Sequence, residues 1–260
     1  MTLLEAIILG IIQGLTEFLP VSSSGHLGLS SMLFGLEEEG LMFMVLLHVG
    51  TLVPVVAVFW HDVWALIKKP FQRMTYLLIV ASVPVAVVGM LLRDLVSGTF
   101  LSLPALAMGF VVTGTVLLIS DRFKKGTKNS DKITFFDALC IGIAQAVAIM
   151  PGISRSGSTI SMALARGINR RDAAKFVFLM SIPTILGALI VEIIDLATSG
   201  EQIFANINPL TTAAGFLASM ISGYFAIKLL FAAIKKAKLR YFAYYVLSLA
   251  AAIIIGFIIL

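Results

Sequence analysis

Two stretches of this chain decide its fold: residues 13–26 read QGLTEFLPVSSSGH, and residues 145–157 read QAVAIMPGISRSG. Shifting the sequence by 132 positions aligns the regions around them without a gap. Chance matches are common between two apolar segments, so the evidence for a repeat rests on the polar and glycine pairs at the break. Seven of the identical pairs are Ala6–Ala138, Gly10–Gly142, Ile11–Ile143, Gln13–Gln145, Ser22–Ser154, Ser24–Ser156 and Gly25–Gly157, and Glu5 aligns with Asp137. The chain is therefore predicted to be duplicated.

Each stretch interrupts an apolar segment. Ala6–Leu36 is broken by Pro20 and the serines that follow it, and Ile133–Ala165 is broken by Pro151–Gly152 and a second polar run. Each half is too short to cross a bilayer comfortably, because a spanning helix needs about 20 apolar residues. Small polar residues of this kind are not tolerated on a lipid-facing backbone. We therefore predict two re-entrant pairs, in which one helix enters the membrane, the chain turns, and a second helix leaves it.

The rest of the composition is that of a membrane protein. Of the 260 residues 59% are apolar and only 13% are charged, with a mean hydropathy of +1.03; a soluble domain is usually about 45–50% apolar and about 25% charged. These values exclude a soluble globule and a disordered chain. With a net charge of only +5, the basic pI does not indicate a nucleic-acid binder. Six further segments are predicted to span the membrane, namely Leu41–Trp60, Thr75–Leu92, Leu103–Ser120, Phe176–Val191, Ile207–Ile227 and Tyr241–Leu260.

The basic residues set the predicted orientation. They gather in four loops, at residues 68–73, 122–132, 166–175 and 235–240, whereas the alternate loops are poor in lysine and arginine. Placing the basic loops in the cytoplasm satisfies the positive-inside rule and puts both termini outside. The first re-entrant pair then enters from outside and the second from the cytoplasm.

The predicted fold is thus an all-α integral membrane protein with six transmembrane helices and two re-entrant helix pairs, arranged as an inverted-topology repeat. It forms a single polytopic membrane domain over residues 1–260, with internal repeats at about 1–120 and 133–260. In such architectures broken helices meet near the middle of the membrane and form the binding site there.

Polar residues at membrane depth are costly, so each is a functional hypothesis. Gln13 and Glu17 are four residues apart and share one face of the first helix. Interhelical hydrogen bonding alone is the alternative explanation for both, and it is weaker for Glu17, because a buried carboxylate is more costly than a buried amide.

The first break, with Ser22, Ser23, Ser24 and Gly25, opens a short helix whose free N–H groups suit an anion. His26 follows as a candidate base, acid or nucleophile. An ordinary serine cap with a structural histidine is the alternative.

The second break repeats this pattern with Ser154, Ser156 and Gly157, and it adds Arg155 and Thr159. An arginine between serines at a helix start fits a phosphate in a bidentate manner. An arginine that reaches to the interface or pairs with a structural carboxylate is the alternative. If the two breaks meet, their groups suit a phosphate or diphosphate.

GLTEFLPVSSSGH and PGISRSGST closely resemble the undecaprenyl-diphosphate phosphatase family, the BacA-type bacitracin-resistance proteins. The resemblance covers nearly the whole chain. It implies hydrolysis of a polyprenyl diphosphate lipid to the monophosphate in the plasma membrane, which recycles the lipid carrier of cell-wall synthesis. The residues carried over are Glu17, Ser23, His26 and Arg155, and more loosely Ser22, Ser154, Ser156 and Thr159. Gln13 stands where some members carry a second glutamate.

The resemblance also implies a divalent cation, Mg²⁺ or Ca²⁺, with Glu17 as a ligand together with Gln13, and a site that opens to the outer face. Ser23, His26 or an activated water could attack the phosphorus, and the sequence does not choose among them. It also leaves open whether the chain acts as a monomer or a homodimer.

The sequence also bears on two other classes of membrane protein and on one further histidine. A PAP2-type lipid phosphatase needs a histidine six residues after its arginine, where this chain has Ser161, so that family is rejected. A polyprenyl-phosphate flippase or transporter would use the same inverted repeat, but Glu17, Ser23, His26 and Arg155 are more than a passive anion site needs. His48 either lines the cavity or is a satisfied core histidine.

Overall fold

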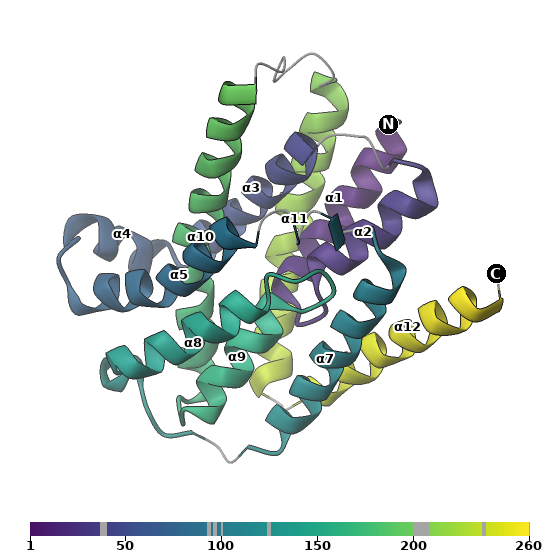
Figure 1. Cartoon of the computed structure of the whole chain (residues 1–260). Helices are drawn as coiled ribbons and strands as arrows, with labels where there is room; N and C mark the ends of the chain where they lie inside the picture. Colours follow the sequence, from purple (N-terminus) through teal and green to yellow (C-terminus); the bar gives the residue numbers. More distant parts are fainter. Residues whose placement is uncertain are drawn as a thin grey trace.

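The computed structural model describes residues 1–36, 41–92, 95, 98–99, 101–123, 126–199, 208–235 and 238–259. Several loop residues used for the predicted orientation, at 37–40, 124–125 and 236–237, lie outside this range. The helices are α1 (Leu3–Phe18), α2 (Ser23–Phe34), α3 (Leu41–Val58), α4 (Trp60–Lys68), α5 (Arg73–Leu91), α7 (Leu103–Asp121), a 3₁₀ turn η1 (Ser130–Lys132), α8 (Phe135–Val147), α9 (Arg155–Ala165), α10 (Arg170–Ser199), α11 (Pro209–Lys235) and α12 (Leu239–Ile259) (Figure 1). No β-strand of two or more residues occurs in the described part, which is all-helical as predicted.

Five of these helices are long and apolar enough to cross a membrane, namely α5, α7, α10, α11 and α12, among the described residues. The sixth predicted span, Leu41–Trp60, is not one straight helix. The chain bends by 90° between α3 and α4, so this pair counts as a span only when the two are taken together. Large apolar side chains remain exposed on these helices, such as Ile79 of α5 and Ile255 of α12, which is expected of a multi-pass membrane protein.

The two predicted breaks are present, and each separates two short helices. We call α1–α2 the first broken pair and α8–α9 the second. Their helix starts match bond for bond: Thr2 forms a capping box with Glu5, and Thr134 forms one with Asp137. After each break a serine caps the next helix, since the Ser22 and Ser154 hydroxyls accept the Gly25 and Gly157 N–H groups at 3.3 and 3.0 Å.

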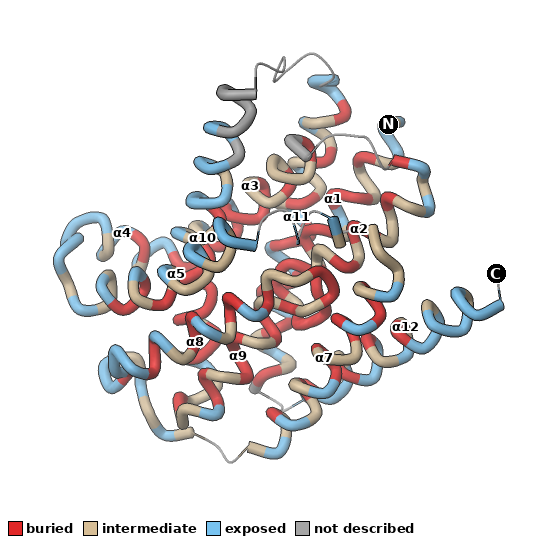
Figure 2. Tube along the Cα trace, viewed as in Figure 1, coloured by how far each residue is buried: buried red, intermediate tan, exposed pale blue. Residues whose placement is uncertain are grey.

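Each broken pair packs against a helix of the other half of the chain. α1 lies along α11, and α8 lies along α5 (Figure 1). The backbones approach closely, because a methyl group on Gly10 would clash with the Gly215 carbonyl, and one on Gly142 would clash with the Ala81 carbonyl. This exchange interlocks the halves and brings the two breaks together in the buried centre of the molecule (Figure 2).

Candidate active site

The first break presents its polar groups through an unusual backbone turn. α1 ends at Phe18 and α2 begins at Ser23, with Ser22 as its N-cap. Ser22 has φ of +72°, and it is the one non-glycine residue with positive φ in the part of the chain that the structure describes. Such a conformation costs about 1–3 kcal/mol and is found preferentially at functional sites. It turns the start of α2 back toward the end of α1.

Glu17 is the centre of the polar cluster that results. Its side chain is only 4% exposed. Oε2 accepts hydrogen bonds from Ser23 Oγ at 2.7 Å and from Gln13 Nε2 at 3.1 Å. The other oxygen, Oε1, lies 3.4 Å from Nη1 of Arg155. The carboxylate therefore joins both broken pairs.

Arg155 stands at the first position of α9, after the second break. Its Nη1 is buried and makes no hydrogen bond within the described residues, although it is ion-paired with Glu17. The remaining guanidinium is partly open, since 31% of the side chain is exposed. The sequence left open whether Arg155 pairs with a structural carboxylate, and its carboxylate partner is Glu17. The Arg155 guanidinium still has N–H donors that could bind an anion.

The hydroxyl groups of Ser154, Ser156 and Thr159 at the second break make different hydrogen bonds. Ser154 caps α9, whereas the Ser156 hydroxyl donates to the Leu19 carbonyl at 3.0 Å and so ties the second break to the first. The Thr159 hydroxyl donates back to the Arg155 carbonyl at 2.7 Å. Sequence reasoning missed Thr113 of α7, which accepts the Ser154 N–H and donates to the Gly152 carbonyl. One of two threonines in a largely apolar helix gave no signal for this role.

His26 lies on α2, and its hydrogen-bond partners differ from those of Glu17. Its Nδ1 is 2.7 Å from the Ser22 carbonyl, and its Nε2 is 2.8 Å from the Tyr245 hydroxyl. No hydrogen bond or ion pair joins His26 to Glu17 in the described structure. Tyr245 is a second residue that sequence reasoning missed, because it lies 219 positions from its partner in an apolar helix.

His48 of α3 belongs to the site. Its Nδ1 is 2.8 Å from the Met44 carbonyl, and its Nε2 is 3.6 Å from Oε2 of Glu17. The sequence left open whether this residue lines a cavity or is a satisfied core histidine. The structure places it against the buried carboxylate.

The side chains around Glu17 show whether the site fits the divalent cation that the family resemblance implies. No group of three or more histidine, cysteine or acidic residues lies close enough to hold an ion anywhere in the described residues. Glu17 supplies one carboxylate, and Gln13 Oε1 is a buried oxygen without a hydrogen-bond partner among the described residues. These two oxygens fit a hard cation that is shared with phosphate oxygens, as Mg²⁺ commonly is.

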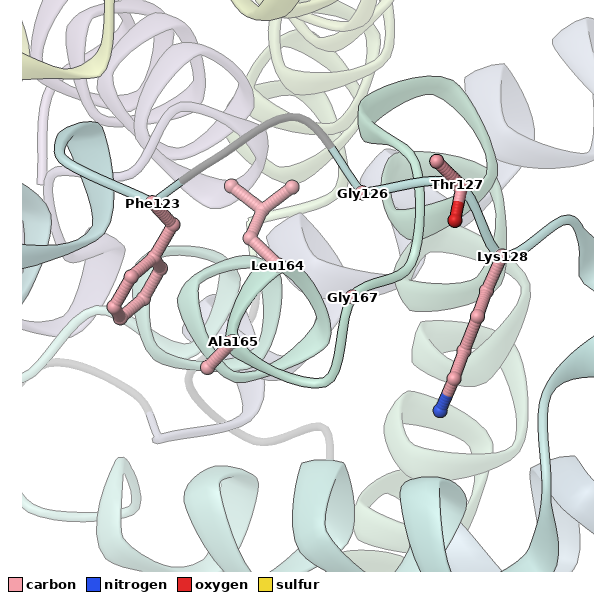
Figure 3. A pocket seen from close by; sticks show the side chains of 7 residues that line it. All are labelled: Phe123, Gly126, Thr127, Lys128, Leu164, Ala165 and Gly167. Carbon is pink, nitrogen blue, oxygen red and sulfur yellow. The ribbon is translucent and has the colours of Figure 1, made fainter.

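A separate charged cluster anchors the second broken pair. Asp137, fully buried at the start of α8, pairs with Arg166 at 2.7 Å and with Lys128 at 3.0 Å. Burial alone would raise the pKa of Asp137, but hydrogen bonds from Thr134, Arg166 and Lys128 outweigh it and hold the pKa well below its ordinary value. A cavity of about 360 Å³ lies beside this cluster, lined by the loop at Lys128 and the end of α9 at Leu164 (Figure 3). None of the Glu17 cluster lines it.

The fold and the site define a class of protein: a multi-pass helical membrane protein whose two broken pairs bring a buried carboxylate, an arginine and helix-start serines together, a set suited to a phosphorylated ligand. The family described as bacitracin resistance protein BacA matches residues 6–252, and the chain belongs to this family. It is 47% identical to the "Undecaprenyl-diphosphatase" of Carboxydothermus hydrogenoformans, with 96% of each chain covered. It is 41% identical to the protein of the same name from Alkaliphilus metalliredigens, with 98% of each covered, and 42% identical to "Undecaprenyl-diphosphatase 3" of Bacillus cereus, with 98% of this chain and 97% of that one covered.

Proposed function

We propose that this protein hydrolyses undecaprenyl diphosphate to undecaprenyl monophosphate and inorganic phosphate, and thereby recycles the lipid carrier of cell-wall synthesis and confers bacitracin resistance. Family membership and the names of the relatives support this activity. The observation that carries it at the level of chemistry is the hydrogen bond of 2.7 Å from Ser23 to Glu17 beside the Arg155 guanidinium. The flippase alternative is not favoured, because the relatives carry the name of a hydrolase.

Binding of the diphosphate rests on two helix starts and one arginine. α2 and α9 both begin at a break, and the N-terminus of a helix attracts anions through its free N–H groups and its dipole. Arg155 adds a permanent charge and a planar set of donors. The hydroxyls of Ser24 and Ser22, 3.3 Å apart, are placed to add hydrogen bonds to phosphate oxygens. The bound phosphates therefore lie between the two breaks.

Phosphoryl transfer begins at Ser23. Its hydroxyl already donates to Glu17, so the carboxylate is in place to take that proton as general base. The Ser23 oxygen then forms a bond to the terminal phosphorus while the bond to the bridging oxygen breaks, and undecaprenyl monophosphate leaves. Water afterwards hydrolyses the phosphoserine and releases inorganic phosphate. Arg155 stabilises the charge on the transferring group.

Two alternative reaction routes differ from this one in the group that attacks the phosphorus. In the first, Glu17 activates a water that attacks the phosphorus directly, and Ser23 only orients it. In the second, His26 is the nucleophile. The Tyr245 hydroxyl at 2.8 Å engages the His26 Nε2 lone pair, which supports Ser23 over His26 as the attacking group.

A divalent cation, Mg²⁺ or Ca²⁺, is part of the proposal. Glu17 and Gln13 would hold it together with the diphosphate oxygens, where it would offset negative charge. Arg155 and the helix starts hold the phosphates, and Glu17 moves the proton.

The proposed arrangement in the plasma membrane has six spans, with the two broken pairs as re-entrant pairs of opposite orientation. Both termini and the opening of the active site then lie on the outer face. The exchange of α1 and α8 between the halves supports an inverted repeat, because equivalent helices take equivalent partners.

Release of inorganic phosphate by purified protein in detergent tests the function. We expect turnover of undecaprenyl diphosphate, and of a shorter polyprenyl diphosphate for comparison, without any membrane across which transport could occur. Purified, folded protein that releases no phosphate in the presence of Mg²⁺ or Ca²⁺ would contradict the proposal.

A further inference from the structure

Tyr245 of α12 contacts His26 of α2 in two ways. Its hydroxyl lies 2.8 Å from Nε2, and its ring stacks on the imidazole with the centroids 5.6 Å apart and the planes at 14°. Phe110 of α7 meets the same imidazole edge-on at 5.4 Å. The ring of His26 is thus held by side chains from two other helices.

The hydrogen bonds of His26 fix which nitrogen carries the proton. A carbonyl oxygen only accepts, so Nδ1, at 2.7 Å from the Ser22 carbonyl, must be the donor. In a neutral imidazole the other nitrogen is then the acceptor, and Nε2 accepts from the Tyr245 hydroxyl. Both nitrogens are satisfied, and the lone pair of Nε2 points at the phenol.

We propose that Tyr245 is a positioning residue for His26: its ring and hydroxyl hold the imidazole in place, and the hydroxyl occupies the Nε2 lone pair until the diphosphate takes over the phenolic hydrogen bond. This inference rests on the proposed function, because the ligand that takes over the phenolic hydrogen bond is the diphosphate substrate. It assigns a role in the reaction to a residue of α12, far from both breaks in sequence.

The chemistry of the phenol supports an exchange of partners. A hydroxyl that donates to a charged phosphate oxygen makes a hydrogen bond roughly twice as strong as one to a neutral nitrogen. Tyr245 is 50% exposed, whereas the Glu17 side chain is 4% exposed, so Tyr245 lies nearer the surface of the protein than Glu17. A headgroup that arrives there can draw the hydroxyl away and leave Nε2 free to accept a proton or another hydrogen bond.

Tyr245→Phe removes the hydroxyl and retains the stacked ring. We expect kcat to fall about two- to tenfold, as for one neutral hydrogen bond that holds His26, and KM to rise, because the phenol can no longer donate to the bound diphosphate. The matched control is Tyr244→Phe, on the same helix and 54% exposed, which should keep wild-type kinetics. Steady-state phosphate release in detergent measures both variants.

A double-mutant cycle separates positioning from a general structural effect. If Tyr245 acts on turnover through His26, Tyr245→Phe should change kcat of the His26→Ala variant by less than about twofold. An equal loss in both backgrounds would overturn the inference while leaving the proposed function intact. A fully active His26→Ala variant would overturn the inference and leave the proposed function intact, because no step of the proposed reaction uses His26.

The imidazole ¹⁵N spectrum gives a readout that does not depend on activity. The chain has three histidines, so the His26 signals can be assigned by their loss in His26→Ala. In Tyr245→Phe we expect the Nε2 resonance to move toward that of an unbonded acceptor while Nδ1 keeps its proton. An unchanged Nε2 resonance would show that the phenol does not hold this nitrogen.

Discussion

The Ser23 hydroxyl donates a 2.7 Å hydrogen bond to Oε2 of Glu17, and this bond spans the break between α1 and α2. The positive φ of Ser22 makes the short connection possible, because it reverses the chain within a few residues. A base and a hydroxyl are therefore in contact before any substrate binds. That geometry is the reason to place proton transfer at Glu17 and to test the two residues separately.

Glu17→Gln removes the base and keeps the size of the side chain. We expect kcat to fall at least about 100-fold, the lower end of typical general-base contributions. Gln13→Ala should cost less, because a neutral amide supplies only hydrogen bonds. Glu5→Gln, on the same helix but in the exposed capping box, serves as the control and should keep wild-type kcat. Near-normal turnover by Glu17→Gln would remove Glu17 from the mechanism.

Ser23→Ala separates covalent from direct hydrolysis. If Ser23 is the nucleophile, turnover should fall to background while substrate affinity survives. If water attacks directly, the loss should be one hydrogen bond, about 0.5–1.5 kcal/mol or up to about tenfold. The control is Ser30→Ala, on the same helix, whose hydroxyl bonds only to the His26 carbonyl among the described groups. Measuring kcat and substrate affinity for both variants decides between the routes.

Asp137 should make the free energy of unfolding depend on pH in the acidic range. Its pKa is lowered in the folded protein, so its contribution is fully present above the ordinary pKa of about 4 and is lost as the pH falls below that value. Asp137→Asn should therefore lower the free energy of unfolding by about 2 kcal/mol at pH 7, between the values for exposed and buried ion pairs. Asp131→Asn, at an exposed position, is the control. Thermal unfolding in detergent at pH 7 and at decreasing pH tests this, and equal stability of the two variants would contradict it.

The proposed orientation can be tested with single cysteines, since Cys140 is the one cysteine to replace first. Cysteines at Ser102 and Asn208 should react with an impermeant thiol reagent in intact cells. Cysteines at Phe71 and Thr127 should react only after the membrane is opened. The reverse pattern would invert the topology and the side on which the active site opens.

The sequence predicted the broken pairs and their functional groups because polar residues in an apolar chain stand out. The repeat offset also pointed to the serine caps, which the structure places at both helix starts. It could not reveal His48 or Tyr245 as partners of Glu17 and His26, because those contacts join helices far apart in the chain. The 90° bend after α3 was missed for a different reason: Leu41–Trp60 is mostly apolar along its whole length, and hydropathy carries no signal for the direction of the chain.

Arg155 should be the residue whose loss damages both binding and turnover. Its guanidinium is held 3.4 Å from Glu17 Oε1 at the start of α9, and its buried Nη1 has no hydrogen-bond partner among the described residues. Arg155→Lys keeps the charge but loses the planar pair of donors, so we expect a clear loss in kcat/KM. Arg155→Ala should lose more, and it leaves Glu17 without this counter-charge.

The division of that loss between kcat and KM identifies what Arg155 does. If it stabilises the transferring phosphoryl group, the loss appears in kcat as well as in KM; if it only holds the substrate, KM alone rises. Arg171→Lys, at an exposed position after the start of α10, is the matched control and should keep wild-type values. Steady-state phosphate release by the three variants measures both constants. An Arg155→Ala enzyme with unchanged kinetics would remove the arginine from the phosphate site, and with it the reason for placing the diphosphate between the two breaks.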